Sequence, residues 1–249
     1  MTIPDKTVET SPQTYARTGG ALYLIIILFG GFAEGVVMDR LVVSGDAAAT
    51  AHNILASPML WRLSLAGNLV VPLFAVVSMW IIYLLLRPVS ANLALLAVFS
   101  NLVSLAVEAI SKLFLLLIVP ILGNTEYLKA FEPQQLQVLA NLALKSHDIA
   151  FNIALIFFAL TCLVDGYLIF RSLYFPKFVG ILLQLAGVSY LIACFSALFA
   201  PAFADLIIPA ILLPALVGEA SFCLWLLIVG VNVAKWNERM TVAGLSPPL

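Results

Sequence analysis

The sequence predicts an all-α fold, a polytopic membrane helical bundle of six transmembrane helices with both termini cytoplasmic. Of its 249 residues, 63% are hydrophobic and only 10% are charged, whereas soluble domains carry about 25% charged residues. The mean hydropathy is +1.11, and six apolar runs each reach the roughly 20 residues that a membrane-spanning helix needs. Because lipid offers the backbone no hydrogen-bond partners, segments that cross it in such runs form helices.

The six apolar runs have local signals at several of their ends. Ser57 followed by Pro58 is typical of an N-cap and the first helical residue, Ser90 is placed to cap the third helix, and Phe175-Pro176 separates the fourth helix from the fifth. The runs cover residues 18–38, 58–86, 92–122, 147–170, 177–200 and 205–233.

Orientation follows from the distribution of Lys and Arg. The N-tail (1–17), the second and fourth loops and the C-tail (234–249) contain seven of these residues, and the first and third loops contain four. Since basic residues accumulate on the cytoplasmic side, both tails are predicted to be cytoplasmic, with one transmembrane domain (18–233) between them. The first run is longer than a signal-peptide core, so we expect it to be retained.

Two loops on the opposite side have helical character of their own. Asp46 is a suitable N-cap for a short alanine-rich helix that ends before Pro58 and lies on the membrane surface. Residues 133–146 place several apolar side chains on one face, so this stretch either docks at the membrane interface or extends the fourth helix outward.

Ionisable side chains inside the spans are the strongest functional signal, because each costs about 2.5–3.5 kcal/mol to insert and usually pairs within the bundle. Glu108 and Lys112 are four residues apart on the third helix and can form an ion pair. Such a pair either only neutralises two charges or forms one arm of a binding site. Glu34, near the outer end of the first helix, also needs a partner.

Glu219 lies near the middle of the sixth helix, directly after Gly218 and five residues after Pro214. With Pro209 further along the same run, this pattern predicts a kinked or partly unwound helix at the carboxyl group. Broken helices near the membrane midplane often line solute cavities. The alternative is a protonated Glu219 that hydrogen-bonds a neighbouring helix.

Further polar residues stand near the outer ends of two helices: Arg62 and Asn68 in the second, and His147, Asp148 and Asn152 in the fourth. His147 is either a ligand or catalytic group, or a residue that only caps the helix end. Together these residues predict one cavity that opens outward. Its expected acid and base groups are Glu108, Glu219 and His147, and its expected binding groups are Glu34, Arg62, Asn68, Lys112, Asp148 and Asn152. Asp165 is expected to lie apart, as an interfacial charge beside Arg171.

Composition and missing motifs exclude several classes of function. The net charge is -1 and no basic run occurs, so nucleic acid is not a partner, whereas membrane lipids are. The sequence contains no nucleophile elbow, H-E-x-x-H, P-loop or dinucleotide fingerprint and indicates neither a metal site nor a particular cofactor. The three cysteines, which lie in apolar segments without ligand spacing, are expected to be buried thiols.

The chain resembles a bacterial family of multi-pass membrane proteins catalogued as a domain of unknown function. The resemblance covers most of the chain between residues 16 and 233, and its most specific segments are 16–24, 45–50 with Asn53-Ile54, 147–152, 166–168, Phe175-Pro176 and 218–226. It implies a helical protein of the bacterial inner membrane and lends no activity, cofactor or catalytic residue.

Three classes of function fit these observations. The first is a membrane enzyme or binding protein for a lipophilic small molecule, with Lys112 or Arg62 stabilising charge. The second is a transporter of a small solute, coupled to protons through Glu108 or Glu219, each of which lies in the last helix of a three-helix half. The third is a structural or regulatory membrane protein whose polar residues only fix helix packing.

Overall fold

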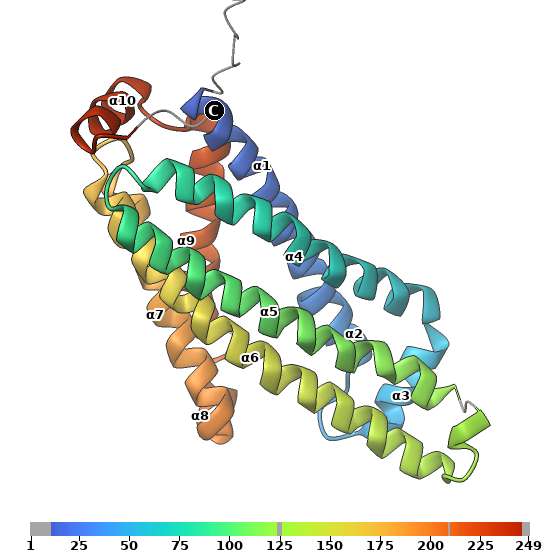
Figure 1. The fold of residues 1–249 in the computed structure, drawn as a ribbon. Helices are drawn as coiled ribbons and strands as arrows, with labels where there is room; N and C mark the ends of the chain where they lie inside the picture. The colour runs from blue at the N-terminus through green and yellow to red at the C-terminus, as the bar shows by residue number, and fades with distance from the viewer. Residues whose placement is uncertain (1–10, 124–125, 209, 246–249) are drawn as a thin grey trace, which may run out of the picture.

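The computed structural model describes residues 11–123, 126–208 and 210–245. Within these residues, six helical segments are long and apolar enough to cross a membrane. The prediction of an all-α protein with six spans is confirmed, and the chain is a multi-pass membrane protein (Figure 1). The spans are Pro12–Leu41, Pro58–Leu86, Ala91–Leu122, Pro133–Arg171, Lys177–Phe199 and Ala210–Val229.

The first and last spans are each built from several helical pieces, whereas the four between them are single helices. The first span joins α1 (Pro12–Gly30), the π-helical η1 (Gly31–Val37) and α2 (Met38–Leu41). The next four are α4 (Pro58–Leu86), α5 (Ala91–Leu122), α6 (Pro133–Arg171) and α7 (Lys177–Phe199). The last joins η3 (Ala210–Leu212), α9 (Leu213–Leu224) and the π-helical η4 (Trp225–Val229). Shorter helices outside the spans are α3 (Ala47–Ala56), η2 (Glu126–Leu128), α8 (Pro201–Ile207) and α10 (Val233–Val242).

Most helix starts follow the local signals of the sequence. The Ser90 hydroxyl accepts a hydrogen bond from the Leu93 backbone N–H at 3.4 Å, as expected of an N-cap. Pro58 is the first residue of α4, but the Ser57 side chain makes no capping hydrogen bond. The first span begins at Pro12, earlier than predicted, because Ser11 caps it.

The fourth span resolves the two alternatives for residues 133–146 in favour of a helical extension. Helix α6 runs without interruption over 39 residues from Pro133. Glu132 and Gln135 form a reciprocal capping box at its start, which fixes the helix terminus well before the predicted one. The predicted alanine-rich helix is α3, and the Asp46 carboxylate accepts the Ala49 backbone N–H at 2.9 Å.

The predicted single helix over 205–233 is wrong in detail. The chain leaves α8 at Ile207 and re-enters a helix only at η3, with Pro214 in the first turn of α9. Pro209 lies outside the described residues. Glu219 belongs to the regular part of α9, so the break precedes this carboxyl group instead of coinciding with it.

The six spans form a closed ring in which each packs against the next, in the order α1, α4, α5, α6, α7, α9 and back to α1. Helices α5 and α6 run side by side along most of their length (Figure 1). We name the two ends of the ring after the short helices that lie there, the α3 end and the α10 end. The outward faces of the spans carry large exposed apolar side chains such as Leu73, as contact with lipid requires.

Helix α10 and the start of α1 lie at the same end of the ring (Figure 1). Helix α10, in the predicted C-tail, is anchored by Trp236, which is 2% exposed and whose indole N–H donates to the Leu85 carbonyl at 3.2 Å. Residues 1–10 of the N-tail, with Lys6, and residues 246–249 of the C-tail lie outside the described residues.

Candidate functional site

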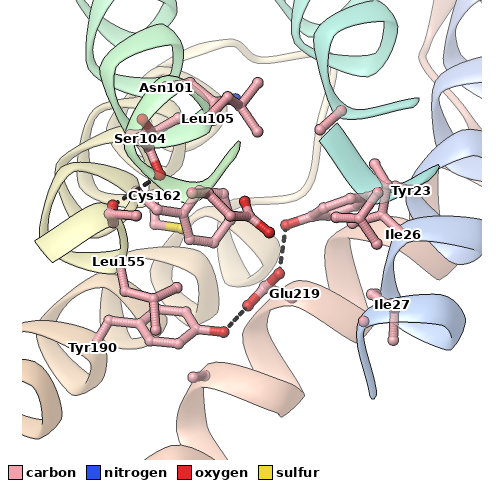
Figure 2. Close-up of a pocket in the computed structure, with 18 of the residues that line it drawn as sticks. Tyr23, Ile26, Ile27, Asn101, Ser104, Leu105, Leu155, Cys162, Tyr190 and Glu219 are labelled. Atoms are coloured by element: carbon pink, nitrogen blue, oxygen red, sulfur yellow. Dashed lines mark hydrogen bonds between the residues drawn. The ribbon is translucent and has the colours of Figure 1, made fainter. Parts of the chain in front are cut away.

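A cavity of about 350 Å³ lies inside the ring and receives side chains from all six spans. Its walls are mainly aliphatic and aromatic, and a smaller set of polar groups points into it (Figure 2). Ligand sites in proteins typically combine such an apolar surface with a few convergent polar groups. The polar side chains are Tyr23, Glu34, Asn68, Ser78, Asn101, Ser104, Glu108, Thr161, Asp165, Tyr190 and Glu219.

The buried cation Lys112 organises the α3 end of the cavity. Its side chain is only 1% exposed, and its Nζ lies 2.6 Å from Oε1 of Glu34 and 3.8 Å from Oε1 of Glu108. The Nζ atom also lies 4.5 Å from the centre of the Phe151 ring. The predicted pair of Glu108 and Lys112 is therefore present, but the shorter contact of Lys112 is with a different span.

Glu34 reaches Lys112 from the π-helical stretch η1. Wider π-type turns inside a span occur often at functional sites. Here the irregular stretch presents a carboxyl group whose two oxygens contact different partners, Lys112 and His147. Glu34 thus links the first span to the third and the fourth.

His147 is buried, at 1% exposure, and both ring nitrogens have partners. Nδ1 lies 3.2 Å from the Ser111 carbonyl oxygen, and Nε2 lies 3.4 Å from Oε2 of Glu34. Because a carbonyl can only accept, Nδ1 must carry the hydrogen of the first contact. The second contact then needs one further proton, held by either the imidazole or the carboxyl group. His147 also stacks on Phe151.

Glu219 is held by two tyrosine hydroxyl groups in the middle of the ring. Tyr23 on α1 donates to Oε2 at 2.9 Å, and Tyr190 on α7 donates to Oε1 (Figure 2). The three side chains come from three spans, so this network fixes α9 against both of its neighbours in the ring. The sequence held no signal for it, because the partners are 196 and 29 residues away from Glu219.

The prediction for Asp165 is wrong. This residue was expected to lie apart from the cavity beside Arg171, yet it lines the cavity and is only 7% exposed. Within the part of the chain that the structure describes, its carboxyl group has no hydrogen bond or ion pair. A second void of about 10 Å³, near the size of one water molecule, adjoins Asp165, Asn101 and Thr161 toward the α10 end.

Several predicted site residues do not reach the cavity. Arg62 and Asp148 are exposed, and neither is among the lining residues. The Asn152 amide donates to the Asp148 carbonyl of its own helix at 2.8 Å. Asn68 does line the cavity, and its amide nitrogen is buried without a partner among the described residues.

Among the described residues, no group of three or more His, Cys, Asp or Glu side chains is placed to bind a metal ion. The three cysteines are free and buried, as expected, and Cys162 lines the cavity. One further polar contact joins two helices at the cavity: the Ser104 hydroxyl donates to the Ala154 carbonyl at 2.8 Å and so links α5 to α6.

A family model described as a domain of unknown function, DUF4386, matches residues 18–230. This range covers all six spans except the first residues of α1, and it agrees with the resemblance found in the sequence. No curated protein and no solved structure matches the chain.

Proposed function

The chain belongs to the DUF4386 family of unknown function, and we propose that it binds a small lipophilic molecule in the central cavity. The observation that carries this proposal is the cavity of about 350 Å³, which is apolar over most of its wall and lined by the carboxyl groups of four acidic residues. An apolar wall favours a lipophilic ligand, and buried polar groups would orient it.

We further propose that bound molecules undergo acid–base chemistry. Glu219 and Glu108 line the cavity, and both are within reach of a ligand there. The two tyrosine hydroxyl groups would hold the Glu219 carboxyl group in one orientation, which proton transfer requires. His147 lies behind the wall and would act through Glu34, so we assign it a positioning role.

The second candidate is a proton-coupled transporter of a small solute. It is favoured by the placement of Glu108 and Glu219, which come from the third and the sixth span and line the same cavity. Transporters with repeated halves often place their binding site between corresponding helices. A transporter would move its solute unchanged, whereas an enzyme would yield a changed molecule.

For the setting, we propose the bacterial inner membrane with both termini cytoplasmic. The excess of Lys and Arg in the tails and in the second and fourth loops supports this orientation. The α10 end of the ring would then face the cytoplasm, and the cavity would open toward the α3 end, outside the cell.

Mass spectrometry of molecules that co-purify from native membranes tests the proposed function. Wild type is compared with Glu108→Gln and Glu219→Gln at matched folding, and Asp205→Asn serves as the control because Asp205 is an exposed acid on α8 that does not line the cavity. We expect a discrete lipophilic molecule in wild type and the control that is lost from both cavity variants. Identical bulk lipid in all four samples would favour a structural or regulatory protein instead.

A further inference from the structure

The charges that line the cavity are all of one sign. Four carboxyl groups line it, from Glu34, Glu108, Asp165 and Glu219, and within the described part of the chain no Lys, Arg or His is among the lining residues. The basic groups Lys112 and His147 lie behind the wall at the α3 end, each at 1% exposure.

Two of the four acids are neutralised by these basic groups. Lys112 balances one carboxylate, because its Nζ lies within 4 Å of both Glu34 and Glu108. The proton shared between Glu34 and His147 leaves that pair without net charge, whether it resides on the imidazole or on the carboxyl group. The α3 end of the cavity is therefore balanced internally.

The other two acids have no cation among the described residues. Glu219 accepts hydrogen bonds from Tyr23 and Tyr190, which favour its charged form without neutralising it. Asp165 is more than nine-tenths buried, faces the cavity and has no hydrogen bond or ion pair to any described residue. A buried carboxylate without a partner is costly, so it takes up either a proton or a cation.

The walls around these two acids favour an organic cation over a bare ion. Aromatic rings of Tyr23, Phe158, Tyr190 and Phe222 line the cavity, and their faces attract cations. The volume of about 350 Å³ is at the lower end of the range for sites of drug-sized ligands and far exceeds that of an inorganic ion. Binding such a ligand would balance the charge of one of the two acids, and the apolar groups of the ligand would be buried against the wall.

We propose that the ligand of the cavity is a lipophilic cation, such as a protonated or quaternary amine, whose charge lies between Asp165 and Glu219 while its apolar groups contact the aromatic wall. This inference rests on the proposed function and specifies its ligand class. It assigns the charge recognition to the half of the cavity away from Lys112, where the acids are not neutralised.

Binding of two probe ions of the same shape and opposite charge tests this proposal. Equilibrium dialysis of the full chain in detergent measures saturable binding of tetraphenylphosphonium, a cation, and tetraphenylborate, an anion, with protein-free micelles as the blank. Asp165→Asn and Glu219→Gln are compared with Asp205→Asn, which removes an exposed carboxylate outside the cavity. Monodisperse elution and an unchanged helical circular dichroism signal select the folded variants.

We expect saturable binding of tetraphenylphosphonium with at least about tenfold preference over tetraphenylborate, and at least about tenfold weaker cation binding in each cavity variant but not in Asp205→Asn. The comparison of the two ions in wild type decides the charge of the ligand even if a variant fails to fold. Cation binding that folded Asp165→Asn and Glu219→Gln both retain would overturn the proposed recognition site.

Failure of this inference can be distinguished from failure of the proposed function. Equal or tighter saturable binding of tetraphenylborate overturns the cationic ligand and leaves a lipophilic binding site in place. The conclusion is the same if neither ion binds saturably but a neutral or anionic molecule co-purifies from native membranes: the cationic ligand is overturned and the binding site stands. Absence of both probe binding and a co-purified molecule overturns the binding function as well.

Discussion

The Nζ atom of Lys112 lies 2.6 Å from Oε1 of Glu34, a residue 78 positions earlier in the chain and in a different span. The contact joins the π-helical stretch η1 to α5, and both of these elements contribute residues to the wall of the cavity. At 1% exposure Lys112 has little access to water, so the neighbouring carboxylates take the place of water as its polar partners. Together with the contact between Glu34 and His147, this ion pair joins the first span to the third and the fourth at the α3 end.

The ion pair predicts an asymmetry between a single and a triple substitution. Glu34→Gln leaves Lys112 with Glu108 alone, at 3.8 Å, and should destabilise the fold by about 1.5–3 kcal/mol because the buried ammonium group loses its charged hydrogen-bond partner. Glu34→Gln combined with Glu108→Gln and Lys112→Met removes the cation and both carboxylates that contact it, so no charge is left unbalanced and much of that loss should be recovered. Thermal unfolding in detergent measures the difference, and a triple variant less stable than Glu34→Gln would contradict the prediction.

The contacts of His147 predict which of its nitrogens carries hydrogen. Because Nδ1 faces the Ser111 carbonyl, it should appear as an N–H nitrogen in ¹⁵N NMR of histidine-labelled protein. The chain has two histidines, so His52→Gln leaves the His147 signals alone in the spectrum. In Glu34→Gln the new amide can itself donate to Nε2, and that nitrogen should then appear without hydrogen. A spectrum with a bare Nδ1 would contradict the geometry.

Gly218 predicts a site where a single methyl group disrupts packing. A Cβ at this position would collide with the Leu182 carbonyl oxygen and lie 2.8 Å from the Ala186 Cβ, because α7 and α9 approach closely there. Gly218→Ala should therefore cost about 1–3 kcal/mol by overpacking. Gly35→Ala is the matched control, since nothing lies within 4 Å of its new Cβ. The unfolding temperature should fall for Gly218→Ala only. Equal stability of the two variants would show that α7 and α9 can separate at no cost.

The proposed orientation predicts one-sided labelling of new cysteines. The native thiols Cys162, Cys194 and Cys223 are at most 2% exposed, so wild type should react little with a membrane-impermeant maleimide. In intact bacterial cells Ser44→Cys, near α3, should be labelled and Val242→Cys, at the end of α10, should not. Permeabilised cells should label both. The reverse pattern in intact cells would place the termini outside.

Local signals determined the parts of the fold that need no long-range contacts. An apolar run of about 20 residues forms a spanning helix whatever its neighbours are, because the backbone must satisfy its own hydrogen bonds in lipid. The caps at Ser90 and Asp46 are also predictable from the sequence, because the donor and the acceptor of each capping hydrogen bond are only three residues apart. The pair of Glu108 and Lys112 is also local, one helical turn apart.

The extent of the fourth and sixth spans was less predictable. Residues 133–146 are amphipathic, and only their packing in α6 shows that they continue the span. In the last span, the prolines indicated a break but not its position relative to Glu219, which depends on where α9 begins to pack against α7.

The sequence by itself determined the six-span helical protein and the set of ionisable residues that its spans must accommodate. Only the tertiary structure decided how those residues are grouped: Glu34 with Lys112 and His147, Glu219 with two tyrosines, and Asp165 in the cavity without a partner among the described residues. These groupings depend on the order of the spans around the ring and on the rotation of each helix. Close contacts at small residues such as Gly218 set that rotation, and hydropathy along the chain carries no information about it.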